Sequence, residues 1–247
     1  MKQHSDINIV SSDLIAESNL FSILVAGIPF YASNWKEAYG TLLSDQHLRK
    51  LASRIIKHLI EGDAFDQLPC FEEEVKPAYT EIINYFKPFV DYMNEATDQD
   101  EIVRIWANAI ENAPFHYLLT LMGQRFTPAS ARDASALPPN SETLLTSCLA
   151  PYNEQVSVAT RAWEKHIGRS EDDFWGEIKG NALEKNEKVQ ALISKMMSKK
   201  TWWNVFHHYK HGLVYEIRMA SGHGLRWNRT GTVFIGFLEP FLESSDE

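Results

Sequence analysis

Residues 201–240 decide the fold of the C-terminal part of the chain and read TWWNVFHHYKHGLVYEIRMASGHGLRWNRTGTVFIGFLEP. Apolar and polar residues alternate over 213–220 with a period of two, which is typical of a half-buried strand. Two glycine-bearing turns separate this strand from two further apolar stretches, 225–227 and 232–237. The pattern therefore predicts a three-stranded antiparallel meander.

Upstream of this stretch, apolar residues recur with helical spacing. Asp98 with Glu101 and Asn181 with Glu184 have the spacing of a capping box, so each pair predicts a helix start. A further helix is expected to be bent or broken at Pro88. Because so small a sheet must pack on helices, we expect an α+β fold, predominantly helical, with a small C-terminal three-stranded antiparallel meander.

Residues 124–141, QRFTPASARDASALPPNS, contain three prolines and many small polar residues. Such a stretch is typical of a linker or long loop. It divides a helical region, 1–123, from residues 142–247, which combine helices with the meander. Two separate domains and one continuous domain both remain open.

The charge distribution is uneven along the chain. The net charge is −9, yet residues 161–229 carry 13 basic and 8 acidic side chains. An acidic chain is a poor general binder of nucleic acid, whereas a local basic region suits a small anionic molecule. A solvated surface with no ligand is the alternative.

The longest apolar run, residues 20–31, is shorter than the ~20 residues of a membrane span, so we expect no membrane contact and a cytoplasmic location. Cys70 and Cys148 fit no metal or redox spacing and are expected to be reduced, buried thiols.

Two blocks of sequence resemble a known family. They are AxRAWxKHxxRS…FWGxxxG…EKNEK, within 159–188, and WWNVFHHYKHGxVYExR…GxGxRW…GTxFxGFLEP, within 202–240. Together they resemble an uncharacterised protein family that shares this C-terminal block and has no known activity. The resemblance covers the last third of the chain. The part GHGLRWNRTGTVFIGF is also similar to a single MORN-type hairpin repeat.

The histidines of the last block are candidates for proton transfer. On a helix, His207 and His211 would share one face and could grip a metal, with Glu216 or His223 as a third ligand. The HExxH pattern is absent, however, because His208 stands where its glutamate would be, and we predict no metal site. The alternative is that these histidines cap a helix end.

Two groups of basic residues are candidates for ligand binding. Arg161, Lys165 and Arg169 would form a stripe on one helical face, which can hold a phosphate or carboxylate unless it is an ordinary solvated face. Arg218 lies on the same face of the predicted strand as Glu216, and Arg226 comes from the neighbouring strand. If that face lines a cleft, a histidine beside Glu216 can act in acid–base catalysis; if it faces water, these are surface ion pairs.

The leading hypothesis is a soluble enzyme that acts on a small anionic or polar metabolite by histidine and carboxylate acid–base chemistry, with its cofactor unknown. The alternative is a non-catalytic helical interaction protein or homodimerising scaffold; a homo-oligomer fits either, and nucleic acid is an unlikely partner. The expected catalytic residues are His207, His211, Glu216 and His223. The expected ligand-binding residues are Arg161, Lys165, Arg169, Arg218 and Arg226.

Overall fold

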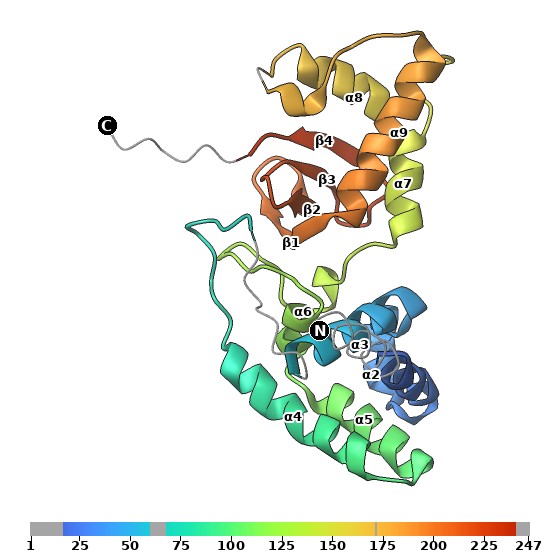
Figure 1. The fold of residues 1–247 in the computed structure, drawn as a ribbon, viewed down its shortest axis with the longest axis vertical. Coiled ribbons are helices and arrows are strands. Elements are labelled where there is room, and N and C mark those ends of the chain that lie inside the picture. Colours follow the sequence, from blue (N-terminus) through green and yellow to red (C-terminus); the bar gives the residue numbers. More distant parts are fainter. Residues whose placement is uncertain (1–16, 60–67, 171, 241–247) are drawn as a thin grey trace, which may run out of the picture. The chain divides into compact units, whose positions relative to one another are not determined.

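A computed structural model describes residues 17–59, 68–170 and 172–240. The expected α+β class, mostly helical with a C-terminal antiparallel sheet, is confirmed (Figure 1). The described residues fall into two compact units. Residues 17–59, 76–124 and 132–137 form the first unit, and residues 68–75, 125–131 and 138–240 form the second.

The first unit is helical. After a helical stretch over 17–26, its helices are α2 (Ser33–Tyr39), α3 (Asp45–Leu59), α4 (Tyr79–Glu95), α5 (Gln99–Asn112) and α6 (Phe115–Leu121), with 3₁₀ turns at Ile28–Phe30, Gly40–Leu43 and Ala134–Ala136. As predicted, Asp98 caps α5, and its carboxylate accepts hydrogen bonds from the backbone N–H groups of Asp100 and Glu101. Helix α4 runs unbroken through Pro88, because the buried side chains of Phe86 and Val90 hold both halves against the core.

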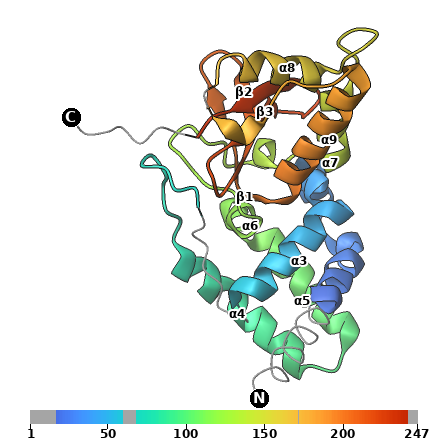
Figure 2. The same cartoon turned by 45° about the horizontal axis from the view of Figure 1, so that its top comes forward.

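The second unit contains three helices and the sheet. Its elements are α7 (Ser141–Leu149), α8 (Val158–Ile167), the 3₁₀ turn Asp173–Trp175, α9 (Ala182–Ser198), β1 (Lys200–His208), β2 (Gly212–Met219), β3 (Gly224–Asn228) and β4 (Phe234–Leu238). Helix α9 begins with the predicted capping box of Asn181 and Glu184. Helices α7 and α8 pack on β4, and α9 packs on β2 and β3 (Figures 1 and 2).

The sheet has four strands in the order β1-β2-β3-β4, each antiparallel to the next. Strands β2, β3 and β4 correspond to the predicted meander, and β1 is an addition to it. The residues of β1 are rich in aromatic and β-branched types, which favour strands. Because β1 ends at His208, His207 lies on a strand and His211 in the turn that follows, so a shared helical face for these two residues is wrong.

One face of the sheet is apolar and lies under the helices. It buries side chains from all four strands, including Trp203, Tyr215, Trp227 and Phe237. The indole Nε1 of Trp227 donates to the backbone oxygen of Leu144 in α7, at 3.2 Å. Each such side chain contributes about 1.5–3 kcal/mol of hydrophobic stabilisation, so this face anchors the sheet to the helices.

The other edge of β1 also has a neighbour. Residues 125–131, within the predicted linker or long loop, run beside it. The N–H groups of Arg125 and Ala131 donate to the oxygens of Trp203 and Val205, and the N–H of His207 donates to Ala129. The first strand of the sheet is thus hydrogen-bonded along both of its edges.

No helix among the described residues is long and apolar enough to cross a membrane. Both cysteines are free thiols. Cys148 is buried as expected, and burial raises the pKa of its thiol to about 12. Cys70 is exposed, contrary to expectation, because it lies in a surface segment beside the sheet.

Candidate functional site

The sheet face that looks away from α7, α8 and α9 carries polar and aromatic side chains. Asn204, Glu216 and Arg226 are direct partners across β1, β2 and β3, and Trp202 and Arg218 are partners in the next row. Residues paired in this way project from the same face of a sheet. We call this face, with the following residues, the polar face: Trp202, Asn204, Phe206, His208, Glu216, Arg218 and Arg226.

Three charged residues form a linked group at the centre of the polar face, the ion triad. Nε of Arg218 donates to Oε1 of Glu216 at 2.6 Å, and Nη2 of Arg226 lies 2.6 Å from Oε2 of the same carboxylate. The side chain of Glu216 is only 2% exposed, whereas that of Arg226 is 15% exposed. One carboxylate therefore holds two guanidinium groups, and the excess positive charge lies on the more exposed partner.

Arg218 is also tied to the end of the sheet. Its Nη1 donates to the backbone oxygen of Gly222 at 2.6 Å and to that of Glu239 at 2.9 Å. Burial lowers the pKa of Arg218, while the Glu216 carboxylate opposes this shift. Across the strands, a Cβ on Gly224 would lie 2.9 Å from Cγ of Arg218 and 2.5 Å from the oxygen of Ile217, so only glycine fits beside this arginine.

Two histidines stand at the β1–β2 end of the polar face. The rings of His208 and His211 are stacked, with centroids 5.0 Å apart. Burial, followed by the positive charge of Arg226, lowers the pKa of His208. Its Nδ1 accepts a hydrogen bond from the backbone N–H of Lys210 at 3.2 Å, so the neutral ring carries its proton on Nε2. The guanidinium carbon of Arg226 lies 5.8 Å from the ring of Phe206.

The structure brings together four of the residues predicted from sequence. His211, Glu216, Arg218 and Arg226 all belong to the polar face or to the turn at its end. His207 does not, because side chains alternate along β1 and its neighbour His208 projects from the polar face.

Sequence reasoning missed His208, Trp202, Asn204 and Phe206. The period-two pattern of TWWNVFHH could have revealed them, since it places alternate residues of 202–208 on one face.

His223 lies at the opposite end of the sheet, in a separate group of residues. We call this group the Trp175 cluster, and its members are His166, Asp172, Trp175, His223 and Glu239. Nε2 of His223 is 2.7 Å from Oδ2 of Asp172, and Nε2 of His166 is 2.9 Å from Oε1 of Glu239. Both imidazole rings contact the indole of Trp175, which donates to the Glu239 carboxylate. Burial lowers the pKa of His166, and the pKa of Asp172 is lowered by the Phe174 N–H and by His223.

Three members of this cluster could hold a metal ion. The ligand atoms of Asp172, His223 and Glu239 lie within 4.8 Å of one another, which makes them a candidate group among the residues that the structure describes. In this structure His223 is hydrogen-bonded to Asp172, and the Glu239 carboxylate accepts a hydrogen bond from Trp175.

The predicted basic stripe lies elsewhere. Arg161 and Lys165 are on α8, and Arg169 follows its end. Arg161 is 3.7 Å from Glu164, and Nε of Arg169 donates to the oxygen of Lys165. Because α8 covers the apolar side of the sheet, these residues are kept apart from the polar face.

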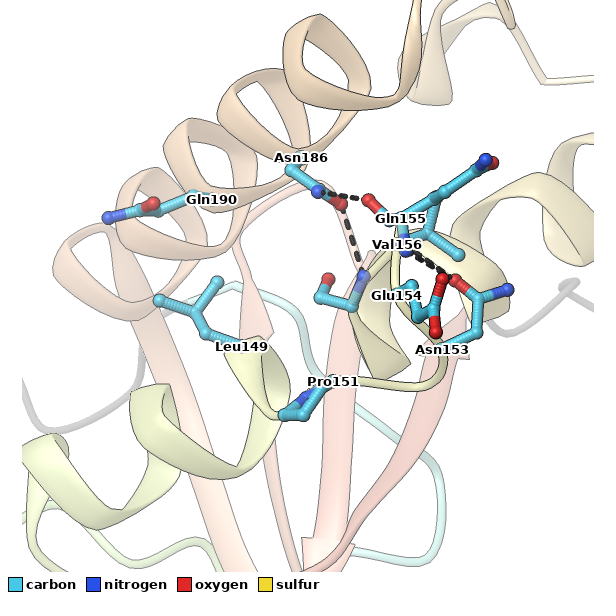
Figure 3. A pocket seen from close by; sticks show the side chains of 9 residues that line it. Leu149, Pro151, Asn153, Glu154, Gln155, Val156, Asn186 and Gln190 are labelled. Atoms are coloured by element: carbon cyan, nitrogen blue, oxygen red, sulfur yellow. Dashed lines mark hydrogen bonds between the residues drawn. The ribbon is translucent and has the colours of Figure 1, made fainter.

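A cavity of about 280 Å³ opens between α9 and the loop that joins α7 to α8 (Figure 3). The side chain of Asn186 braces it by accepting from the N–H of Ser157 at 3.1 Å and donating to the oxygen of Gln155 at 2.9 Å. Its lining has no histidine or basic side chain, with Glu154 as the charged member. Among the described residues, the polar face therefore offers histidine and arginine side chains that this cavity lacks.

Comparison with known proteins finds a similarity for the C-terminal part of the chain. Residues 145–239 match the family model of the CdiA C-terminal tRNase toxin domain. The match begins within α7, ends at Glu239 and includes the whole sheet. A crystal structure of the toxic C-terminal tip of CdiA from Pseudomonas aeruginosa, in complex with immune protein, is 28% identical; the alignment covers 38% of this chain and 99% of that chain, with a TM-score of 0.34. No curated protein matches the chain.

These findings correct four expectations. The C-terminal block does not belong to a family without known activity, because the matching family is described as a tRNase toxin domain. A metabolite enzyme and a non-catalytic scaffold are both contradicted by the same match, as is simple binding of a small anion. The expectation that nucleic acid is an unlikely partner is also contradicted, because the matching family is described as a tRNase toxin domain. Net charge misled here because it averages an acidic first half with a locally basic second half.

Proposed function

We propose that residues 145–239 form a ribonuclease domain that binds and cleaves tRNA on the polar face. The observation that carries the proposal is the ion triad beside the paired rings of His208 and His211, all within the residues that match the tRNase toxin family. The activity belongs in the cytoplasm, where tRNA is found.

The polar face has the composition of an RNA-binding surface. Unpaired bases stack on aromatic side chains and guanidinium planes that project from antiparallel sheets. Trp202 and Phe206 are aromatic groups of this kind, and Arg218 and Arg226 lie next to them on the same face. Arg226 binds Glu216 through Nε and Nη2, and its guanidinium, the more exposed of the two, places a positive charge where it can attract a phosphate.

The histidines supply the chemistry of strand cleavage. In the proposed reaction the ribose 2′-oxygen attacks the adjacent phosphorus, and its proton passes to the exposed His211. His208 donates from Nε2 to a phosphate oxygen, and Arg226 offsets the growing negative charge. The bond to the 5′-oxygen breaks, this oxygen takes a proton from solvent, and a 2′,3′-cyclic phosphate remains. Glu216 keeps both guanidinium groups in place.

The test is cleavage of tRNA by the full chain in the presence of EDTA, with the product ends identified. We expect His211→Ala to lower kcat by about 10²–10⁴-fold, the usual contribution of a general base. His207→Ala is the matched control, since this exposed neighbour projects from the other side of β1. Full activity of His211→Ala and Arg226→Lys, with both variants folded, would refute the proposed site.

The Trp175 cluster favours a second mechanism for the same substrate. If Asp172, His223 and Glu239 bind a divalent metal, the ion would activate a water molecule for hydrolysis of the phosphodiester. EDTA would then abolish cleavage, His223→Ala would remove both metal and activity, and no cyclic phosphate would form. The same EDTA experiment therefore separates the two mechanisms.

A further inference from the structure

A short segment that precedes residues 145–239 by about 70 positions in the sequence lies against the polar face in the structure. Residues 68–75, LPCFEEEV, belong to the second unit and are here called the strap. One end is tied to the sheet by the Thr201 hydroxyl, which donates to the oxygen of Leu68. The other end is tied by the N–H of Val75, which donates to the oxygen of Phe126 at 2.8 Å. The strap is thus held at both ends beside β1.

Between these ends, Phe71 covers the Trp202 row of the polar face. Its ring meets the indole of Trp202 edge-on, with centroids 5.3 Å apart, and the guanidinium carbon of Arg218 lies 5.4 Å from the ring centre. Trp202 and Arg218 are each 3% exposed. The aromatic and guanidinium groups best suited to stack on a base are therefore already occupied.

Glu74 supplies a negative charge at the same place. Its Oε1 accepts from Nε1 of Trp202 at 3.1 Å, and its Oε2 accepts from Nε of Arg125 at 2.8 Å. Two further carboxylates, Glu72 and Glu73, precede it and are exposed. The strap thus presents an aromatic ring on a guanidinium and a carboxylate on polar N–H groups, which are the contacts that a base and a phosphate of RNA would make.

The two ends of the polar face are covered unequally. At the β1–β2 end, Phe206, His208 and Arg226 keep part of their surface exposed, whereas Trp202 and Arg218 are closed off. The strap therefore covers a binding surface while the histidine end is left accessible. When a binding surface is open for only a fraction of the time, the apparent substrate affinity is the intrinsic affinity multiplied by that open fraction, and the chemical step is unchanged.

We propose that the strap is an internal RNA mimic that competes with tRNA for the Trp202–Arg218 part of the polar face and holds the intact chain at low affinity. This inference rests on the proposed function, since it assigns the same face to RNA. It predicts that loosening the strap lowers KM and leaves kcat unchanged.

The experiment compares tRNA cleavage by the full chain and by the Phe71→Ala/Glu74→Gln double variant. If the strap covers the face for about nine-tenths of the time, the open fraction is about one tenth. Removing the strap contacts should then lower KM by about tenfold. The matched control is Glu72→Gln/Glu73→Gln, which removes two exposed charges of the strap and none of its buried contacts; its KM should fall by much less. An unchanged KM in the Phe71/Glu74 variant would overturn the inference.

A binding measurement separates failure of this inference from failure of the proposed function. The exposed Cys70 can carry a fluorophore, since the buried Cys148 has a raised thiol pKa and reacts poorly. If neither the wild type nor any of the variants cleaves tRNA, the proposed function fails. The Kd values for tRNA then test separately whether the strap competes with RNA. Tighter binding by the double variant, together with a change in Cys70 fluorescence when tRNA is added to the wild type, supports the strap. Equal Kd values and constant fluorescence refute it.

Discussion

The ion triad and the Trp175 cluster both pair carboxylates with cationic side chains, but they expose opposite partners. In the triad the carboxylate of Glu216 is 2% exposed and the guanidinium of Arg226 is 15% exposed. In the Trp175 cluster the side chains of Asp172 and Glu239 are 38% and 40% exposed, and that of His223 only 8%. The first group thus presents positive charge to solvent and the second presents negative charge. A phosphate backbone is attracted to the first and repelled by the second.

This comparison assigns different work to the two groups. The triad holds cations on the face that we propose for RNA, whereas the Trp175 cluster joins the loop after α8 to the ends of β3 and β4. The following predictions test that division.

The largest effect is expected for Glu216→Ala. Removing this carboxylate leaves two guanidinium groups without their shared partner, and loss of one member of a buried ion group costs about 3–5 kcal/mol. Urea unfolding would measure the change in the free energy of unfolding. A loss below 1 kcal/mol would mean that water or other groups solvate the arginines, and that the triad is not a buried network.

A smaller effect on stability is expected for His223→Ala. The variant loses the hydrogen bonds to Asp172 and Ser221, which should lower the free energy of unfolding by about 1–3 kcal/mol. It should leave kcat for tRNA cleavage unchanged.

The opposite result is expected for His208→Ala. This variant should change the free energy of unfolding by less than about 0.5 kcal/mol and lower kcat by about 10²-fold. Thermal unfolding and cleavage rates on both variants provide the check. The reverse result would exchange the roles of the two groups.

Part of the pH dependence of the free energy of unfolding should arise from His166. Burial lowers its pKa below the usual 6.5, so the unfolded chain binds more protons than the folded chain in that range. Stability from this group is complete above about pH 6.5 and is lost as the pH falls through the lowered pKa. Urea unfolding of the wild type and His166→Gln between pH 5 and 7.5 would show a weaker slope in the variant. An identical slope would mean that His166 ionises freely in the folded state.

The smallest effect is expected for Lys165→Ala and Arg169→Ala. Both side chains are exposed on or after α8, so each substitution should change stability by less than about 0.5 kcal/mol. Cleavage at low salt should fall only slightly, through weaker long-range attraction of RNA. Rates measured across a salt series would check this, and a large loss at high salt would instead place RNA on α8.

The sequence predicted those features that depend on neighbouring residues. The capping box of Asn181 and Glu184, the cap at Asp98 and the turns of the meander all follow from local spacing. The sequence does not predict strand β1, because the four-residue spacing of His207 and His211 is typical of a helical face and the aromatic residues of β1 suit either structure.

Contacts between distant segments were beyond sequence reasoning. The convergence of Glu216 with Arg226 was foreseen only as a possibility, because strand register decides it. The pairing of Asp172 with His223 and of Phe71 with Trp202 depends on how loops dock on the sheet, and no periodic pattern records that.

Residues 125–131 give the backbone of β1 a partner along its outer edge. A shorter chain that starts at residue 138 would leave those N–H and C=O groups of Trp203, Val205 and His207 facing solvent as an open strand edge. Such an edge is a template for another strand, so the shortened protein should either recruit a β-strand from a partner or self-associate. Residues 125–131 thus prevent association through the edge of β1. Light scattering should give a larger particle mass per chain for the shortened protein than for the full chain.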